Sequence, residues 1–263
     1  MEAYSYPANI EIKHGAILDI RGNTNTTVMD PKPADGGKIQ FAVGSATIKT
    51  DAGLYRLGGL SIPKLGNTKV VDLNHQNIIV GATTTAYVSG CTITGGSAGY
   101  GGAFDVRNGA AKLNIYNCIV SGNTNTVAGT IAVGWGAGTS VYMSSCELPD
   151  GTIYLTGGGF ADLEASKVYR VRLDGGTCAI GKATTISSYL RPWTTEITTG
   201  YVVISSGAAI TLPTGAVISG GTTGHITVRK GGCTINGSSF GSTAAETYYT
   251  KFDNTTGTVI VTQ

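Results

Sequence analysis

The stretch Gly102–Gly109, GAFDVRNG, is matched one repeat later by Gly129–Gly136, GTIAVGWG. The match continues to Cys118 and Cys146, with one residue inserted before Val141. A unit of this length, built from short alternating strands and glycines, cannot bury its own apolar face. Such units form a core only by stacking on copies of themselves, so this repeat predicts a solenoid.

The composition favours strands and turns over helices. The chain of 263 residues contains 40 glycines, and only 13% of its residues are charged. Thr, Ser, Asn, Val and Ile are frequent, and these residues suit strands and tight turns. We therefore predict an all-β fold, a single-stranded right-handed parallel β-helix (solenoid) of about ten coils with end caps.

One β-helix domain is expected over residues 1–263. Its expected segments are irregular N-terminal coils or a cap (1–67), regular coils (68–186), a loop excursion (187–199), further coils (200–239) and a C-terminal cap (240–263). The turn-rich sequence around Pro31 and Pro33 indicates an irregular excursion near the start of the chain. In the C-terminal cap, Ser242 is expected to begin a short helix that reaches Tyr248.

The five cysteines follow the repeat rather than the spacing of a metal site. Cys91, Cys118 and Cys146 recur at the repeat length, and Cys178 follows after a slightly longer gap. Cysteines at one phase of a β-helix stack inside it as small apolar residues, about 4.8 Å apart. A disulfide is geometrically possible at that distance, but the odd number and shared phase favour buried free thiols. Because no close cysteine pair and no histidine in phase with them exists, we expect no metal and no cofactor.

Several motifs resemble known β-helical families. Gly101-Gly102-Ala103-Phe104 resembles the GGA-plus-apolar half of the polymorphic outer-membrane-protein repeat, and Val120-Ser121-Gly122-Asn123 resembles its F-x-x-N half with Val in place of Phe. Asp72-Leu73-Asn74 and the Cys-x-Ile-x-Gly corners are similar to right-handed parallel β-helices of the pectin-lyase-like superfamily. The resemblance covers residues 68–180 best. It implies a fold that serves polysaccharide lyases and hydrolases, phage tailspikes, autotransporter passengers and adhesins, so it does not choose a function.

The sequence gives little support for catalysis of the kind known in that superfamily. A pectate-lyase-like site needs acidic calcium ligands on adjacent coils, but the residues in phase with Asp105 are Ala132 and Tyr154. A polygalacturonase-like site needs clustered aspartates, a Gly-His-Gly and an Arg-x-Lys segment. Gly224-His225-Ile226 and Arg229-Lys230 depart from both patterns.

One pair of acids keeps a hydrolase open as an alternative. Asp162 and Glu164 are two residues apart on one outward strand face, about 7 Å from Cβ to Cβ by the strand rise. The simpler interpretation is that they are solvated acids balanced by Arg170 and Arg172. We therefore predict no catalytic residues and favour a non-catalytic role over a polysaccharide lyase or glycoside hydrolase.

Aromatic residues in the regular coils favour a binding surface. Tyrosines outnumber phenylalanines 13 to 5, and six aromatic residues fall in these coils: Tyr100, Tyr116, Trp135, Tyr142, Tyr154 and Tyr169. They either form a ladder that stacks on sugar rings, with Asn114, Asn117 and Asp105 offering hydrogen bonds, or pack on one another and stabilise the rod.

The best candidate ligand-binding residues are Asp105, Arg107 and Trp135. Asp105 and Arg107 both point outward because they alternate with core residues, and Trp135 falls at a glycine-flanked corner of the next coil. Two alternatives remain for Trp135: it projects as a platform for a sugar, or it folds over a neighbouring corner as packing. The expected partner is a polysaccharide or host-surface glycan.

Charge and hydropathy exclude other partners. A net charge of +2 does not provide a nucleic-acid footprint. No apolar run approaches the roughly 20 residues that span a bilayer, so we expect no membrane insertion by this chain. The first residues, MEAYSYP, do not resemble a signal peptide. We expect a structural rod or adhesin at the cell surface or outside the cell, or alternatively a component of a phage virion such as a tailspike fragment.

Overall fold

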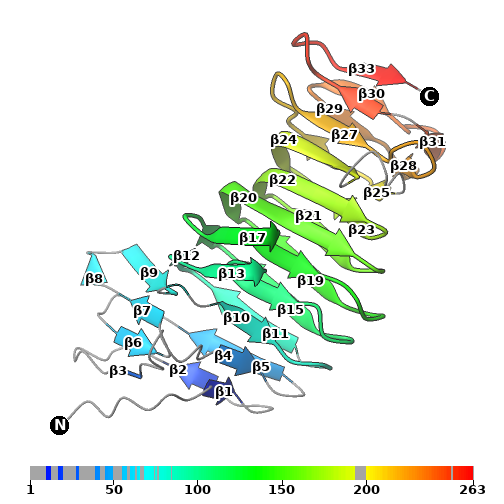
Figure 1. Cartoon of the computed structure of the whole chain (residues 1–263). Coiled ribbons are helices and arrows are strands. Elements are labelled where there is room, and N and C mark those ends of the chain that lie inside the picture. The colour runs from blue at the N-terminus through cyan, green and yellow to red at the C-terminus, as the bar shows by residue number, and fades with distance from the viewer. Residues whose placement is uncertain are drawn as a thin grey trace.

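The computed structural model shows an all-β chain whose strands stack as coils along one axis (Figure 1). It describes residues 77–83, 85–192, 200–249 and 251–262, together with Leu73, His75 and the backbone of strands before residue 73. The coils form a parallel β-solenoid of about six turns, fewer than the ten expected.

The coils build three parallel stacks of strands. The first stack contains β10 (Ile78–Val80), β14 (Phe104–Val106), β18 (Ile131–Val133), residues 152–156 of β20 (Glu147–Thr156), 170–174 of β22 (Lys167–Asp174), 189–192 of β24 (Thr185–Pro192) and β27 (Val217–Ser219). The second stack contains β11 (Thr85–Ser89), β15 (Lys112–Tyr116), β19 (Ser140–Ser144), β21 (Phe160–Glu164), β23 (Thr177–Ile180), β25 (Tyr201–Ile204) and β28 (His225–Val228). The third stack contains β12 (Thr92–Thr94), β16 (Ile119–Val120) and the first residues of β20, β22 and β24, and it continues to β26 (Ala209–Ile210) and β29 (Cys233–Ile235).

The backbone before residue 73 continues these stacks. β1 (Ile10–Ile12) and β4 (Ile39–Phe41) lead to β10 in the first stack. β2 (Ile17–Asp19) and β5 (Ser45–Lys49) lead to β11 in the second, and β9 (Thr68–Asp72) leads to β12 in the third. The remaining strands are β3 (Val28–Met29), β6 (Tyr55–Leu57), β7 (Leu60–Ile62) and β8 (Lys64–Leu65), with antiparallel pairing at β6–β7 and β8–β9. The predicted excursion at Pro31 and Pro33 lies outside the described residues.

Two consecutive coils each contain one extra strand. β13 (Ser97–Tyr100) and β17 (Thr124–Ala128) pair with each other in a separate two-stranded sheet. Each lies between the third stack and the next strand of the first stack in sequence. This extra sheet brings Tyr100 to the first stack, where it becomes part of the candidate site.

The C-terminal cap is built from antiparallel strands, and the predicted helix from Ser242 to Tyr248 is wrong. These strands are β30 (Ser238–Phe240), β31 (Glu246–Tyr248), β32 (Lys251–Asp253) and β33 (Ile260–Thr262). β30 pairs with β29, β31 with β28 and β32 with β27, so one antiparallel strand covers the end of each stack. The need of these open edges for hydrogen-bond partners outweighs the local helical signal.

The predicted loop over residues 187–199 begins later than expected. Residues 187–192 belong to β24, and its Leu190 is fully buried in the core. Residues 193–199 lie outside the described residues.

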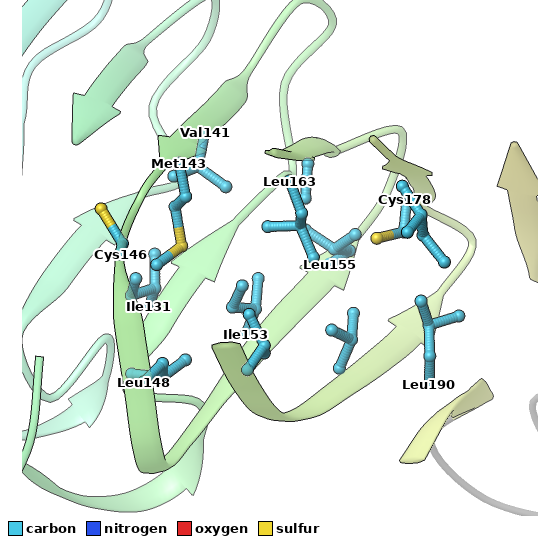
Figure 2. Packing of buried hydrophobic residues seen from close by; sticks show 14 of the residues in the cluster. Ile131, Val141, Met143, Cys146, Leu148, Ile153, Leu155, Leu163, Cys178 and Leu190 are labelled. Carbon is cyan, nitrogen blue, oxygen red and sulfur yellow. The ribbon is translucent and has the colours of Figure 1, made fainter. Parts of the chain in front are cut away.

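The core confirms the register predicted from the repeat. Phe104 pairs with Ile131, and Val106 pairs with Val133. The inserted residue before Val141 is also confirmed, because Leu113 pairs with Val141, one position further on than the repeat alone would place it. The predicted core residues Phe104, Val106, Ile115, Ile131, Val133, Met143, Ile153 and Leu155 are all buried. Figure 2 shows residues of successive coils, among them Ile131, Ile153 and Leu190, lined up along the axis inside the coils.

Cysteines fill one corner of the first coils. Cys91, Cys118 and Cys146 are buried free thiols, as predicted, and the sulfurs of Cys91 and Cys118 lie 3.8 Å apart. The chain enters this corner through a left-handed residue in each coil: Gly90, Asn117, Ser145, Ala165 and Ala183 have φ between 47° and 66°. In the two later coils the corner residue is Ser166 and then Thr184, both buried.

Cys178 does not share this phase, contrary to the sequence prediction. It lies on β23 in the second stack, where it pairs with Ala161 and Val202. The spacing of the cysteines gave a wrong prediction because the coils beyond Cys146 contain fewer residues. The register step from Ile131 to Ile153 spans fewer positions than the step from Phe104 to Ile131, and the step from Ile153 to Val171 spans fewer still. The period of the first coils therefore cannot be extended to Cys178.

Val133→Asp is expected to unfold the central coils. Val133 has no exposed surface, so its replacement buries an unpaired charge and lowers the free energy of unfolding by more than about 3 kcal/mol. Val127→Asp is the matched control, because Val127 on β17 is 48% exposed. Denaturant unfolding followed by circular dichroism measures both. Equal losses for the two variants would contradict the register.

All five thiols are expected to be unreactive in the folded chain. Burial raises the pKa of Cys146 and Cys233 to about 11, and it raises the pKa of Cys178 further. A hydrogen bond from Cys91 instead lowers the pKa of Cys118, but Cys118 is only 1% exposed. Titration with a thiol reagent should find almost none in native protein and five after denaturation without reductant. Fewer than four in denaturant would reveal a disulfide.

Candidate functional site

The three predicted binding residues meet on the outward face of the first stack. Asp105 lies on β14 between the buried Phe104 and Val106, and Arg107 directly follows that strand. Trp135 follows β18, the next strand of the same stack. The site therefore combines two coils, as the repeat predicted.

Asp105 and Arg107 form a two-point ion pair. Arg107 Nε donates to Asp105 Oδ1 at 2.8 Å, and Nη2 donates to Oδ2 at 2.7 Å. The Arg107 backbone N–H also donates to Oδ1, at 3.2 Å. The side chains of Arg107 and Asp105 are 15% and 13% exposed, so the pair is mostly covered although both residues face outward. Such a fork fixes both side chains better than a single contact does.

The Arg107 guanidinium lies between two aromatic rings. Its Cζ is 4.0 Å from the centre of the Tyr100 ring and 4.2 Å from that of Trp135. The two rings also contact each other edge to face, with centroids 5.2 Å apart. Cation–π contacts of this kind orient the guanidinium and the rings together. Arg107 Nη1 is buried without a hydrogen-bond partner, so both of its N–H groups remain unsatisfied.

Trp135 combines features of both predicted alternatives. Its contacts with Tyr100 and Arg107 are packing contacts, yet the residue is 59% exposed. Its φ is 62°, in the left-handed region that bulky residues rarely adopt and that costs about 1–3 kcal/mol. The corner is tight, because a Cβ on the following Gly136 would lie 2.5 Å from the Gly109 Cα of the previous coil. The indole is therefore fixed on one side and open to solvent over most of its surface.

A small second apolar cluster adjoins this group outside the main core. It consists of Ala128, Ala132 and Tyr154, with Tyr100 packed against it. The Tyr154 hydroxyl donates to Asp174 Oδ2 at 2.8 Å. Burial, and then the hydrogen bond to Asp174, raise the pKa of Tyr154 to about 12. Tyr154 thus remains a neutral donor under ordinary conditions.

The aromatic residues do not form one ladder. Tyr116 and Tyr142 lie on the second stack, with ring centroids 5.6 Å apart. Tyr100, Trp135 and Tyr154 gather instead on the outward face of the first stack. The sequence could not separate the two groups because alternation gives the inward or outward direction of a residue but not its stack.

The acid pair lies on the second stack, away from its predicted counterions. Glu164 accepts a hydrogen bond of 2.7 Å from the Tyr142 hydroxyl. Burial and then Glu164 raise the pKa of Asp162, and Arg229 opposes them. Arg170 and Arg172 lie on β22 in the first stack, so the prediction that they balance these acids is wrong. Among the described residues, no group of three or more His, Cys, Asp or Glu side chains is placed to hold a metal ion.

Comparisons with known proteins identified no similar protein. No protein-family model, curated protein or solved structure matches this chain. The likeness to the pectin-lyase-like superfamily therefore rests on the motifs and on the parallel solenoid alone. Within the described part of the chain, no helix is long and apolar enough to cross a membrane.

The stability of the chain is expected to fall between pH 10 and 12, in part through Tyr154. The folded state keeps the Tyr154 proton up to about pH 12, whereas an unfolded tyrosine loses it near pH 10. The unfolded state therefore gains relative stability as the pH rises, by up to about 1.4 kcal/mol per pH unit. Tyr154→Phe removes this contribution, so denaturant unfolding should show a shallower pH dependence for the variant. Parallel curves would contradict the buried, Asp174-bound hydroxyl.

Proposed function

We propose that this chain is a non-catalytic rod or adhesin that binds a glycan on the outward face of its first stack. It acts at the cell surface or as part of a virion. The observation that carries the proposal is Trp135, which is 59% exposed although it is held by Arg107 and Tyr100. An indole fixed on one side offers a sugar ring an apolar platform without a large loss of side-chain entropy.

The groups beside the indole suit sugar hydroxyls. Asp105 offers carboxylate acceptors and Arg107 offers guanidinium donors, from side chains that are 13% and 15% exposed. Their mutual ion pair keeps both side chains in place before a ligand arrives. The strained backbone of Trp135 supports the proposal too, since residues held in rare conformations concentrate at functional sites.

Hydrolysis by Asp162 and Glu164 is the second candidate. The raised pKa of Asp162 is the property that a general acid requires. Against it, Glu164 is exposed, and both acids lie on the outward face of the second stack. A glycan array combined with a reducing-end release assay separates the two, since binding without release supports the adhesin.

Trp135→Ala should abolish binding to the glycans recognised by the wild-type chain on the array. The melting temperature should change by no more than about 2 °C, since the indole is mostly exposed. Trp135→Gly is a companion variant, because glycine accepts a φ of 62° and relieves the strain. Tyr249→Ala is the matched control, since Tyr249 is 62% exposed and belongs to the C-terminal cap.

Retained binding by both Trp135 variants would overturn the proposed site. So would a melting temperature lowered by several degrees in Trp135→Ala with no loss of binding, because Trp135 would then be a packing residue. Loss of binding in Tyr249→Ala as well would show that the array reports exposed aromatic surface in general.

A further inference from the structure

Positive charge gathers on the first stack beyond Trp135. Arg172 on β22 is the register partner of Arg191 on β24, so their backbones lie about 4.8 Å apart. Arg170 lies two residues before Arg172 and faces the same way. Two positive side chains are therefore register partners on one outward face.

In the described part of the chain, no acidic side chain neutralises Arg170 or Arg191. In the ranges that the structure describes, neither Arg170 nor Arg191 has a carboxylate within 4.0 Å. Arg170 donates one hydrogen bond, to the Tyr169 hydroxyl at 3.0 Å, and its Nε is buried without an acceptor. Asp174, an acid of the same strand as Arg170, accepts a hydrogen bond from the Tyr154 hydroxyl instead.

Two tyrosines hold the guanidinium groups in place. Arg170 lies 4.3 Å from the centre of the Tyr169 ring, and Arg191 lies 4.3 Å from that of Tyr189. Arg172 Nε donates to the Tyr189 hydroxyl at 2.8 Å. Planar guanidinium groups suit the two-point binding of carboxylate or sulfate oxygens, and the adjacent rings can contact a sugar.

We propose that Arg170, Arg172, Arg191, Tyr169 and Tyr189 form an arginine–tyrosine subsite for the carboxylate or sulfate groups of an acidic glycan. This inference rests on the proposed function and specifies the class of ligand. One outward column joins the two sites, running from Asp105 through Ala132 and Tyr154 to Arg172 and Arg191. A chain that stacks on Trp135 and lies along the solenoid axis therefore meets the arginines.

A polyphosphate fits this face less well than a glycan. The net charge of the chain is only +2, and Asp105 and Asp174 lie on the same face as the arginines. Nucleic-acid sites depend on larger basic fields. The tyrosines lie beneath or beside guanidinium groups, so they contribute ring edges rather than open platforms for a row of bases.

The test compares dextrans of different charge with one another and with a nucleic acid. Dextran sulfate, carboxymethyl dextran, neutral dextran and a single-stranded DNA are titrated into the full chain by calorimetry at two salt concentrations. Dextran sulfate or carboxymethyl dextran should bind at least about tenfold more tightly than dextran, and binding should weaken at higher salt. The double variant Arg170→Gln/Arg191→Gln should lose about tenfold or more of that affinity, since each arginine can make charge-assisted hydrogen bonds.

A control of equal charge is available in the same chain. Arg229→Gln/Lys230→Gln removes two exposed charges that follow β28 in the second stack, so its net charge equals that of the test variant. It should bind the charged dextrans within about twofold of the wild-type chain. Both double variants should keep the wild-type melting temperature, because the side chains that they replace lie on outward faces.

Three results would overturn the inference: charged dextrans that bind no better than dextran, equal losses in the two double variants, or tighter binding of the DNA than of any dextran. The proposed function fails separately, if Trp135→Ala keeps its array ligands. Binding that depends on the arginines but not on Trp135 would support this subsite and reject the indole platform.

Discussion

The constraint on which the structure depends is that a single coil has no core and few hydrogen bonds of its own. Each strand satisfies its backbone groups on the coils before and after it, as in the register between β14 and β18. The inward residues of one coil bury those of the next, as Phe104 and Ile131 do. Left-handed corner residues such as Asn117 and Ser145 let the chain turn without leaving this register. At the C-terminal end, where no further coil follows, antiparallel strands supply the missing partners.

The same stacking makes a surface from residues far apart in the sequence. A column that begins at Asp105 ends at Arg191, about a third of the chain later, yet it crosses only five strands of one stack. Inward positions accept little except apolar side chains, so chemical variety is confined to the outward positions and the corners. The strained Trp135 lies on this outward face, and so do Arg170 and Arg191, which have no carboxylate partner in the described part of the chain. Neither the strained backbone of Trp135 nor the unpaired charge of these two arginines favours folding, and for this reason we propose that both features serve binding.

The sequence was most informative where the repeat is strict. Two copies of one sequence motif were enough to predict the parallel solenoid, the core positions Val106 and Val133, and the insertion before Val141. Beyond Cys146 the coils shorten, and the period no longer locates Cys178. The prediction of a C-terminal helix was wrong because strand pairing at an open end of the solenoid overrides the local helix propensity. The sequence predicted only some of the residues that contact Trp135. It did not predict Tyr100, because Tyr100 reaches Arg107 from an extra strand outside the three stacks. The position of Arg191 on β24 was not predicted, because the sequence indicated a loop in that segment.

The most direct test of the stacked coils is a long-range distance in solution. Outward residues Asn114 and Thr227 are joined by five register steps, through Tyr142, Asp162, Ala179 and Val203. Spin labels on Asn114→Cys and Thr227→Cys, measured by pulsed electron paramagnetic resonance, should give a narrow distribution centred at about 24 Å, five times the strand spacing. The native cysteines are buried and should take up no label. A broad distribution, or one centred beyond about 35 Å, would contradict a single stack of in-register coils.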